Sequence, residues 1–212
     1  MKKQAQLLAL GTLCVFFALQ QQARAQAVDA PRYEVGAQFS ILRRQDPSAD
    51  TNPGFGGRFT VNLTDNLAVE AQGDFYPSRG SFSGGQMSSG LFGVKAGKRY
   101  ERFGIYAKVR PGLVHFDHAF AGFTEVSITG NPPSSVFVAQ FRGQTEFATD
   151  VGGVLEFYPT RRIVTRFDFG DTIIRYKERN TNFIINNSLV PFTQPGETRH
   201  NLQISAGIGF RF

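Results

Sequence analysis

The chain has 212 residues, of which 41% are hydrophobic, 13% aromatic and 19% charged. This length favours a single domain, and 22 phenylalanines exclude a disordered chain, because so many large apolar side chains need burial or a membrane. The formal charge of +6 would suit a nucleic-acid-binding protein, but part of it lies in an N-terminal segment that we expect to be removed.

Residues 1–25 have the pattern of a secretory signal peptide. Lys2 and Lys3 form a basic start, residues 7–19 are mostly apolar, and Ala23-Arg24-Ala25 is an Ala-x-Ala cleavage motif. A transmembrane helix is the alternative, but an apolar run of about 13 residues falls short of the roughly 20 that cross a bilayer. We therefore expect export and removal of this segment.

The mature chain, residues 26–212, is expected to form one domain. Cleavage leaves 20 basic and 17 acidic residues and removes Cys14, the sole cysteine. An exported chain without disulfides is unlike the small cross-linked scaffolds of many secreted proteins. No later stretch approaches 18 consecutive uncharged apolar residues, so we predict no membrane-spanning helix.

From Tyr33 to the last residue, apolar and polar residues alternate with a period of two, as in β-strands. The last segment is the clearest, because six apolar residues face one way and five polar or small residues face the other. We predict eight strands, over residues 33–41, 55–63, 67–75, 92–97, 103–113, 147–157, 163–169 and 202–212.

The connections between these segments alternate in length. Tight turns are expected at residues 64–66, 99–102 and 159–161. Between them lie four long connections, at residues 43–53, 77–89, 118–144 and 177–199. Short turns at one end and long loops at the other are typical of an up-and-down transmembrane barrel with short periplasmic turns.

A soluble lipocalin-like barrel is the alternative, and the polar face of the strands argues against it. Near-equal opposite charges suit a narrow lumen in which each buried charge has a partner, whereas a base facing lipid at the middle of a membrane would cost about 2–4 kcal/mol. The charged residues of this face are Glu34, Arg58, Glu70, Asp74, Lys95, Lys108, Arg110, Asp150, Glu156, Arg166, Asp168 and Arg211.

Glycine and aromatic residues support the same orientation. Glycines on the polar face would relieve crowding in a narrow lumen, and aromatic residues near strand ends are typical of interfacial girdles. The glycines are Gly36, Gly56, Gly93, Gly97, Gly104, Gly112, Gly152, Gly170, Gly207 and Gly209. The aromatic residues include Tyr33, Tyr100, Phe103, Phe157 and Phe212.

These patterns predict an all-β fold, an eight-stranded antiparallel up-and-down transmembrane β-barrel. An unpaired amide in hydrocarbon costs several kcal/mol, so a sheet in lipid must join its first strand to its last. An even number of strands lets that closing pair run antiparallel.

The chain resembles the small eight-stranded outer-membrane barrels of the OmpA-like and OmpX-like group. The resemblance covers the mature chain in architecture, and its one local motif is the terminal run Ile208-Gly209-Phe210-Arg211-Phe212. It implies that Phe210 and Phe212 are an assembly signal read by the outer-membrane assembly machinery. The fuller OmpA architecture adds a peptidoglycan-binding domain, and this activity is not carried over, because the sequence stops at Phe212.

The first candidate site is the lumen polar network, which could be an ion path or gate, or could fill a closed barrel. We favour the second interpretation, because a barrel of this size has little room beyond its own side chains. We expect a central cluster of Arg58, Glu70, Lys108, Glu156, Arg166 and Asp168. The whole network is Arg58, Glu70, Asp74, Lys95, Lys108, Arg110, Asp150, Glu156, Arg166, Asp168 and Arg211.

Histidines form the second candidate site. His115, Asp117, His118 and His200 lie near the outer ends of predicted strands and could bind a metal or belong to a lipid hydrolase. Outer-membrane lipid A deacylases carry a His-x-Ser signature, but Asp117 follows His115 at that spacing, and palmitoyl-transfer barrels need an apolar interior slot. We therefore interpret these residues as ordinary rim residues and expect no catalytic residue, metal or cofactor.

The long loops are the third candidate site. Residues 125–129 and 136–141 are expected to form two strands around Asn131-Pro132-Pro133, and residues 183–192 are unusually apolar. We predict hairpins that extend the wall beyond the membrane and could bind surface protein partners at exposed strand edges, with loops that pack on themselves as the alternative.

We therefore predict a non-enzymatic outer-membrane barrel with a structural role or a surface-interaction role through its loops. Expected partners are outer-membrane lipid, lipopolysaccharide at the rim and the assembly machinery, without nucleic acid, and we expect a monomer. The alternatives are a lipid A-modifying enzyme and a narrow pore.

Overall fold

The computed structural model describes residues 31–45, 51–77, 84–130 and 134–212. The predicted signal peptide lies outside these residues. Among those described, no helix is long and apolar enough to cross a membrane. The strands of this part of the chain are β1 (Tyr33–Arg43), β2 (Thr51–Asn62), β3 (Leu67–Tyr76), β4 (Gly84–Arg99), β5 (Phe103–Ile128), β6 (Ser134–Phe157), β7 (Ile163–Tyr176), β8 (Arg179–Ile185), β9 (Ser188–Gln194) and β10 (Glu197–Arg211).

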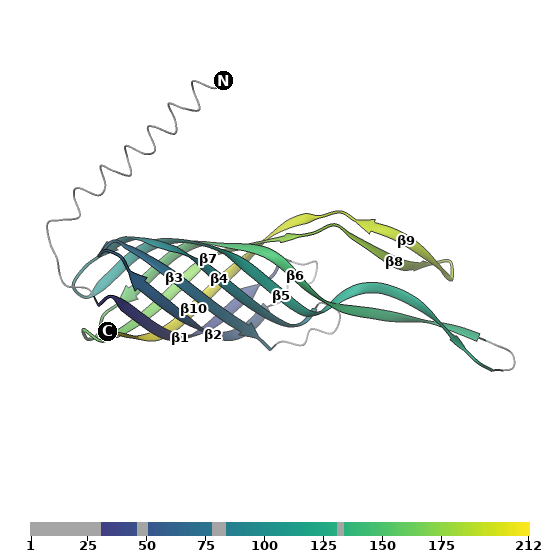
Figure 1. Cartoon of the computed structure of the whole chain (residues 1–212), viewed down its shortest axis with the longest axis horizontal. Coiled ribbons are helices and arrows are strands. Elements are labelled where there is room, and N and C mark those ends of the chain that lie inside the picture. The colour runs from purple at the N-terminus through teal and green to yellow at the C-terminus, as the bar shows by residue number, and fades with distance from the viewer. Residues whose placement is uncertain (1–30, 46–50, 78–83, 131–133) are drawn as a thin grey trace, which may run out of the picture.

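Eight strands close into an antiparallel barrel in the order β1-β10-β7-β6-β5-β4-β3-β2 (Figure 1). The closing pair runs from Glu34 opposite Arg211 to Arg43 opposite Leu202. The backbone groups of Tyr33 and Phe212 extend it, each amide donating to the other residue's carbonyl at 2.9 Å. The predicted eight-stranded antiparallel barrel is confirmed, and pairing of the first strand with the last leaves its wall without an edge.

Three short turns gather at one end of the barrel, which we call the turn end. Two of them use the same device, because the hydroxyl of Thr64 accepts from the amides of Asn66 and Leu67, and the hydroxyl of Thr160 accepts from those of Arg162 and Ile163. These hydrogen bonds stabilise the turns locally, as expected of threonine there. The three predicted turns lie at the expected positions.

The opposite end, which we call the hairpin end, has longer strands and shorter loops than the sequence predicted. β4 begins at Gly84 rather than at residue 92, and β5 and β6 fill most of the segment expected to be a loop at residues 118–144. The predicted strands at 125–129 and 136–141 are therefore parts of β5 and β6, while Asn131-Pro132-Pro133 lies outside the described residues. Strict alternation is lost here because water, unlike lipid, tolerates polar residues on both faces of a strand.

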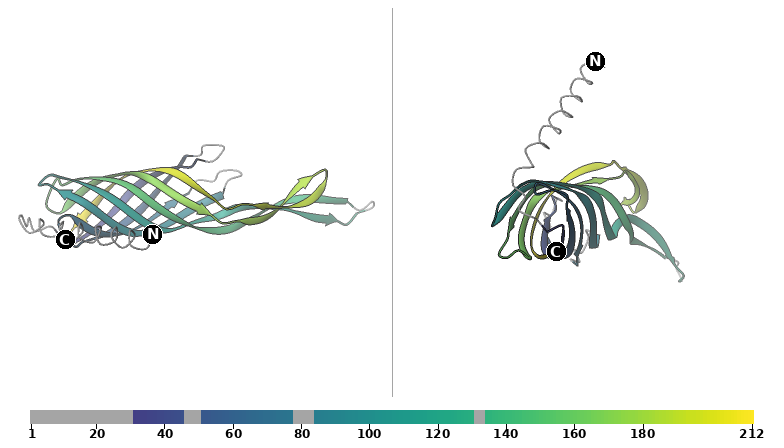
Figure 2. Two further views of the ribbon diagram at one scale, coloured as in Figure 1. Left: turned by 90° about the horizontal axis from the view of Figure 1, so that it is seen from above. Right: turned by 60° about the vertical axis from the view of Figure 1, so that its left-hand side comes forward.

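The connection from β7 to β10 contains a separate two-stranded hairpin, β8–β9. Asn186 and Asn187 join its strands with φ values of 50° and 55°, which suit a type I′ turn, and asparagine adopts this conformation more readily than most residues. Figures 1 and 2 show that β8–β9 and the ends of β5 and β6 project beyond the barrel on the same side.

The two projecting hairpins touch where β8 crosses β5. The rings of Phe120 and Phe183 lie 6.1 Å apart. Beside them Gly122 has a φ of 122°, and a Cβ there would lie 2.8 Å from the amide nitrogen of Asn182. Glycine at this position therefore allows both the backbone conformation and the close approach of β8.

The outer wall of the barrel is apolar. Phe59, Phe92, Phe169 and Ile208 are 45–62% exposed, although they lie in the middle of their strands. At the turn end, Tyr33, Tyr100, Phe103, Phe157 and Phe212 are exposed on the same outer surface. The predicted orientation is confirmed, because apolar side chains point outward and charged ones point into the lumen.

Glycines of the inner face have a more specific role than the one expected. A Cβ at Gly93 would overlap the carbonyl oxygen of Val109, and one at Gly152 would overlap that of Phe169. The space that these glycines leave is thus occupied mainly by the neighbouring strand, not by long charged side chains. Close packing of backbone on backbone lets the wall curve tightly around a narrow lumen.

Candidate functional site

Arg166 of β7 is at the centre of the charged lumen. Its guanidinium contacts three carboxylates: it makes two parallel contacts with Glu70 of β3, donates to Asp168 at 2.8 Å, and lies 3.4 Å from Glu156. The side chain is fully buried. Parallel N–H donation to one carboxylate is the strongest geometry that an arginine offers.

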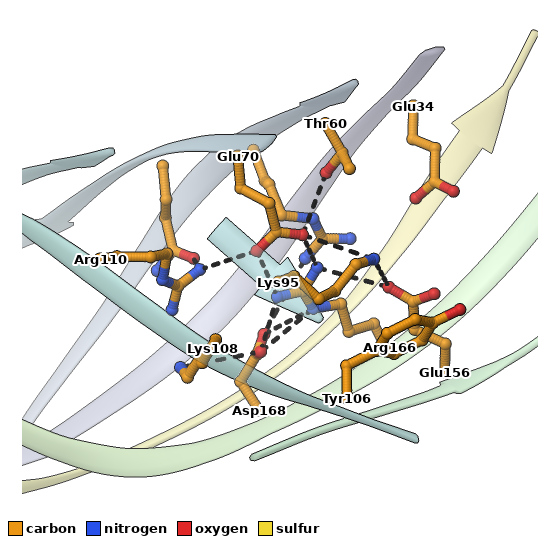
Figure 3. A network of polar contacts seen from close by, with 12 residues as sticks. Glu34, Thr60, Glu70, Lys95, Tyr106, Lys108, Arg110, Glu156, Arg166 and Asp168 are labelled. Atoms are coloured by element: carbon orange, nitrogen blue, oxygen red, sulfur yellow. Dashed lines mark hydrogen bonds and ion pairs between the residues drawn. The ribbon is translucent and has the colours of Figure 1, made fainter. Parts of the chain in front are cut away.

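Lys95 of β4 links two of these carboxylates from the other side. Its ammonium forms an ion pair with Glu156 and lies 3.5 Å from Glu70, and it sits 4.5 Å from the centre of the Tyr106 ring. Figure 3 shows Lys95 and Arg166 converging on the same two carboxylates.

A second group of charges continues the network toward the hairpin end. Lys108 lies 2.9 Å from Asp150 and 3.7 Å from Asp168. Arg110 donates from Nε to Asp150 at 2.9 Å and lies 3.6 Å from Glu70. All of these side chains are buried in the lumen.

Two more charged residues complete this layer. Arg58 lies 3.9 Å from Asp168 and donates to Gln38. Asp74 forms no ion pair with another described residue and instead accepts from neutral donors, Gln38 at 2.7 Å, Ser40 at 3.0 Å and Gln72 at 2.6 Å. We call these five bases and five acids the central network: Arg58, Glu70, Asp74, Lys95, Lys108, Arg110, Asp150, Glu156, Arg166 and Asp168.

The central network is electrically balanced and closely packed. Removing charges from water is costly, and the cost is offset only when each charge meets opposite charges and hydrogen-bond partners in good geometry. The contacts of Arg166, Lys95 and Arg110 meet this condition. The arrangement fills the middle of the lumen with ion pairs. This agrees with the interpretation of these residues as a polar core that fills a closed barrel.

Toward the hairpin end the lumen contains a buried apolar cluster that we did not predict from the sequence, with Arg44 and Glu146 buried beside it. A buried cluster there consists of Leu42, Tyr76, Met87, Leu91, Val114, Phe116, Ala148 and Ile174. The expectation of a charged, glycine-rich interior is therefore incomplete for this end, where apolar side chains are buried as well. Adjacent apolar residues in the strands indicated this cluster, because one residue of each pair must point into the lumen. The pairs are Ile41-Leu42, Leu91-Phe92, Leu113-Val114, Phe147-Ala148 and Ile173-Ile174.

At the turn end a third layer lies inside the barrel. Glu34 accepts from Asn62 at 2.9 Å and lies 3.4 Å from Arg99. Arg211, which the sequence placed with the other lumen charges, is buried here, apart from the central network, and its guanidinium faces the ring of Tyr158. Arg99 was not among the predicted site residues, because it was assigned to a turn.

Phe210 and Phe212, the predicted assembly signal, lie on the outer wall. Both are exposed, at 47% and 59%, and their rings lie 6.3 Å apart. Phe210 lies opposite Val35 in the closing strand pair, and the backbone of Phe212 bonds to Tyr33 at its turn end.

The histidines do not converge. Nδ1 of His115 lies 2.9 Å from the hydroxyl of Thr145, and His118 lies 3.1 Å from Asp117, its neighbour in the chain. His200 lies 2.5 Å from Asp171. Within residues 31–45, 51–77, 84–130 and 134–212, no group of three or more His, Cys, Asp or Glu side chains is arranged to hold a metal ion.

Known proteins similar to this chain are outer-membrane β-barrels. The family profile described as "Outer membrane protein beta-barrel domain" matches residues 10–212. No curated protein matches the sequence. Among solved structures, Neisserial surface protein A (NspA) has 14% sequence identity and a TM-score of 0.53, and the match covers 85% of this chain and 97% of that one.

Two further solved structures are similar at lower scores. Ail, the attachment invasion locus protein of Yersinia pestis, has 12% identity and a TM-score of 0.46, with 85% of this chain and 96% of that one covered. OprG of Pseudomonas aeruginosa has 11% identity and a TM-score of 0.46, with 86% and 96% covered. The likeness to NspA concerns the fold alone.

Proposed function

The chain belongs to the outer membrane protein β-barrel family, and from this premise we propose that it is a non-enzymatic surface protein that binds protein partners through its two projecting hairpins. The barrel anchors these hairpins in the outer membrane. Barrels of this membrane have short periplasmic turns and longer extracellular loops, so the hairpin end is taken to face outward.

The composition and edges of the hairpins carry this proposal. Residues 180–196 contain no charged residue, and residues 119–141 contain only Glu125. Val136, Val138, Ile185 and Phe192 are 43–52% exposed. A water-exposed segment of this composition is suited to contact with another apolar surface.

Unpaired strand edges support the same function. β6 pairs with β7 only from Phe147 onward, so within the described residues its earlier part has one free edge, and β8–β9 has a free edge on each strand. Natural proteins usually protect such edges with charged residues or bulges, because free amide and carbonyl groups can pair with another chain. Partner binding by strand addition uses these groups.

Photo-crosslinking on living cells tests the proposal. A photoreactive amino acid at Val136 or Phe192 should capture a second protein, whereas the same group at Lys98, exposed at the turn end, should not capture it. The absence of a captured protein at both hairpins, or the same product from Lys98, would contradict the proposal.

Export and assembly complete the proposed pathway to the membrane. Residues 1–25 would be removed on export, so the mature protein should begin at Gln26, which N-terminal sequencing measures. Phe210 and Phe212 would then be read by the assembly machinery. Replacing Phe212 with alanine should lower the fraction of protein that migrates as a folded barrel in an unboiled gel.

One observation favours a second candidate function, a lipid-modifying enzyme. His200 and Asp171 form an exposed pair at 2.5 Å near the hairpin end of the outer wall, and the backbone amide of Asn201 also donates to Asp171 at 2.9 Å. A carboxylate that orients an imidazole is a common part of hydrolytic sites. If removal of His200, or of His115 and His118, changed the acyl chains of lipid A in cells, the enzyme would be favoured over the non-enzymatic function.

A further inference from the structure

Two arginines face the same tyrosine ring near the turn-end mouth of the lumen. Arg99 ends β4 and Arg211 ends β10. Their guanidinium carbons lie 5.2 Å and 4.4 Å from the centre of the Tyr158 ring. Both cations thus use one aromatic ring as a platform.

The Tyr158 ring is held in place from behind. Its hydroxyl donates to Glu156 at 2.8 Å and lies 3.0 Å from the hydroxyl of Tyr106, and its backbone amide donates to Arg102 at 2.9 Å. Because Glu156 belongs to the central network, the platform is fixed to the most constrained part of the lumen. The two guanidiniums are therefore positioned by a rigid support.

Two buried guanidiniums share one buried carboxylate side chain, Glu34, inside this mouth. Glu34 lies 3.4 Å from Arg99 and is also the residue opposite Arg211 in the closing strand pair, and its Oε2 has no hydrogen-bond partner among the described residues. The central network is itself balanced. Arg211 is 6% exposed, and its side chain forms no ion pair or hydrogen bond with the part of the chain that the structure describes.

Several N–H donors of the two arginines lack hydrogen-bond acceptors among the described residues. Nε and Nη1 of Arg211 and Nη1 of Arg99 are buried without a hydrogen-bond partner among the described residues. A buried donor without an acceptor is destabilising, and more so when it is charged. Arg166 shows the contrast, because its guanidinium meets three carboxylates in the same lumen.

From this geometry we infer that the turn-end mouth is a binding site for a small oxyanion, a carboxylate or a phosphate group, held between Arg99 and Arg211. Guanidinium groups present pairs of N–H donors that match the oxygens of either anion. A bound oxyanion would supply acceptors for three buried donors that the single carboxylate Glu34 leaves without partners. The anion would enter from the turn end, which is the periplasmic side in the proposed orientation.

Titration of the purified barrel in zwitterionic detergent tests the site. Inorganic phosphate and acetate are titrated by calorimetry at constant ionic strength, with chloride as the balancing anion. The unmodified protein should bind at least one of the two. Arg211→Gln and Arg99→Gln should each weaken binding by about 10-fold or more, because each removes charge-assisted hydrogen bonds.

Two further variants separate recognition from charge and folding. Lys98→Gln removes an exposed cation at the same end, beside Tyr100 on the outer surface, and should leave binding unchanged. Arg211→Lys keeps the charge without the fork of donors and should weaken binding less than Arg211→Gln. Gel mobility without boiling verifies that each variant is folded, and if Arg211→Gln does not fold, Arg99→Gln and Arg211→Lys decide the result.

The source of the anion is distinguished in lipid nanodiscs. If phosphatidylglycerol in a phosphatidylcholine disc competes with phosphate in the unmodified protein, the ligand group can be a lipid headgroup; without competition, it is a soluble anion. The inference is overturned if neither phosphate nor acetate binds, so that water alone meets these donors. It is also overturned if Lys98→Gln weakens binding as much as Arg211→Gln.

Discussion

At the scale of single residues, the lumen shows how a charged core can be stable in a membrane protein. The single side chain of Arg166 contacts three carboxylates, those of Glu70, Glu156 and Asp168. Such an arrangement makes each partner costly to remove, because the charges left behind stay buried and uncompensated. The stability of the barrel therefore depends on complete sets of charges rather than on any one pair.

Replacing Arg166 with methionine should lower the free energy of unfolding by about 3–5 kcal/mol, the usual cost of breaking a buried ion pair on one side. Urea unfolding of the barrel in lipid vesicles, followed by gel mobility, measures the change. Lys98→Met is the control, because this exposed lysine should contribute within about 0.5 kcal/mol. A loss of equal size in both variants would show that the buried network has no special role.

At the scale of elements, glycines decide how closely neighbouring strands approach. Gly152 of β6 faces the backbone of Phe169 and Gly170 on β7, where a side chain has no room. Gly90 of β4 lies on the outer face, and a Cβ there would meet nothing within 4 Å. The two positions have the same residue and the same secondary structure, but opposite packing.

Gly152→Ala should destabilise the barrel by about 1–3 kcal/mol, because an added methyl group would push two strands apart. Gly90→Ala should be neutral or stabilising by up to about 1 kcal/mol, because alanine restricts the unfolded chain without a clash. Both changes are measured by the same urea unfolding. Equal effects at the two sites would contradict the account of strand packing.

At the scale of the whole molecule, the lumen consists of three layers. The mouth at the turn end holds Arg99 and Arg211, the central network fills the middle, and an apolar cluster around Leu91 and Phe116 lies toward the hairpin end. An ion would have to separate the tightly paired charges of the central network, which fill the middle of the lumen. The layers therefore argue against the narrow pore considered for the sequence.

The purified barrel should give no steady single-channel current in planar bilayers. Leu91→Ser alone should not open it, because the central network would still fill the middle of the lumen. Stable conductance steps from the unmodified protein would contradict this prediction and favour the pore. The same preparation should migrate differently in gels before and after boiling, as closed barrels do.

The sequence by itself determined the eight barrel strands, the short turns and the side of the wall on which their residues lie, but not how far the strands extend at the hairpin end. These follow from a two-residue period that the pleat of a strand imposes locally, so that Phe59 faces outward and Glu70 inward whatever their neighbours are. The adjacent apolar pairs, such as Ile173-Ile174, also recorded the apolar cluster of the lumen, although alternation alone did not reveal it.

Only the tertiary structure decided which charges meet. Arg166 and Glu70 are 96 positions apart, and their contact depends on the register of every strand between them around the closed barrel. Register is a relation between strands and leaves no local mark in the sequence. For the same reason the placement of Arg99 and Arg211 over one tyrosine ring became visible only once the barrel had closed.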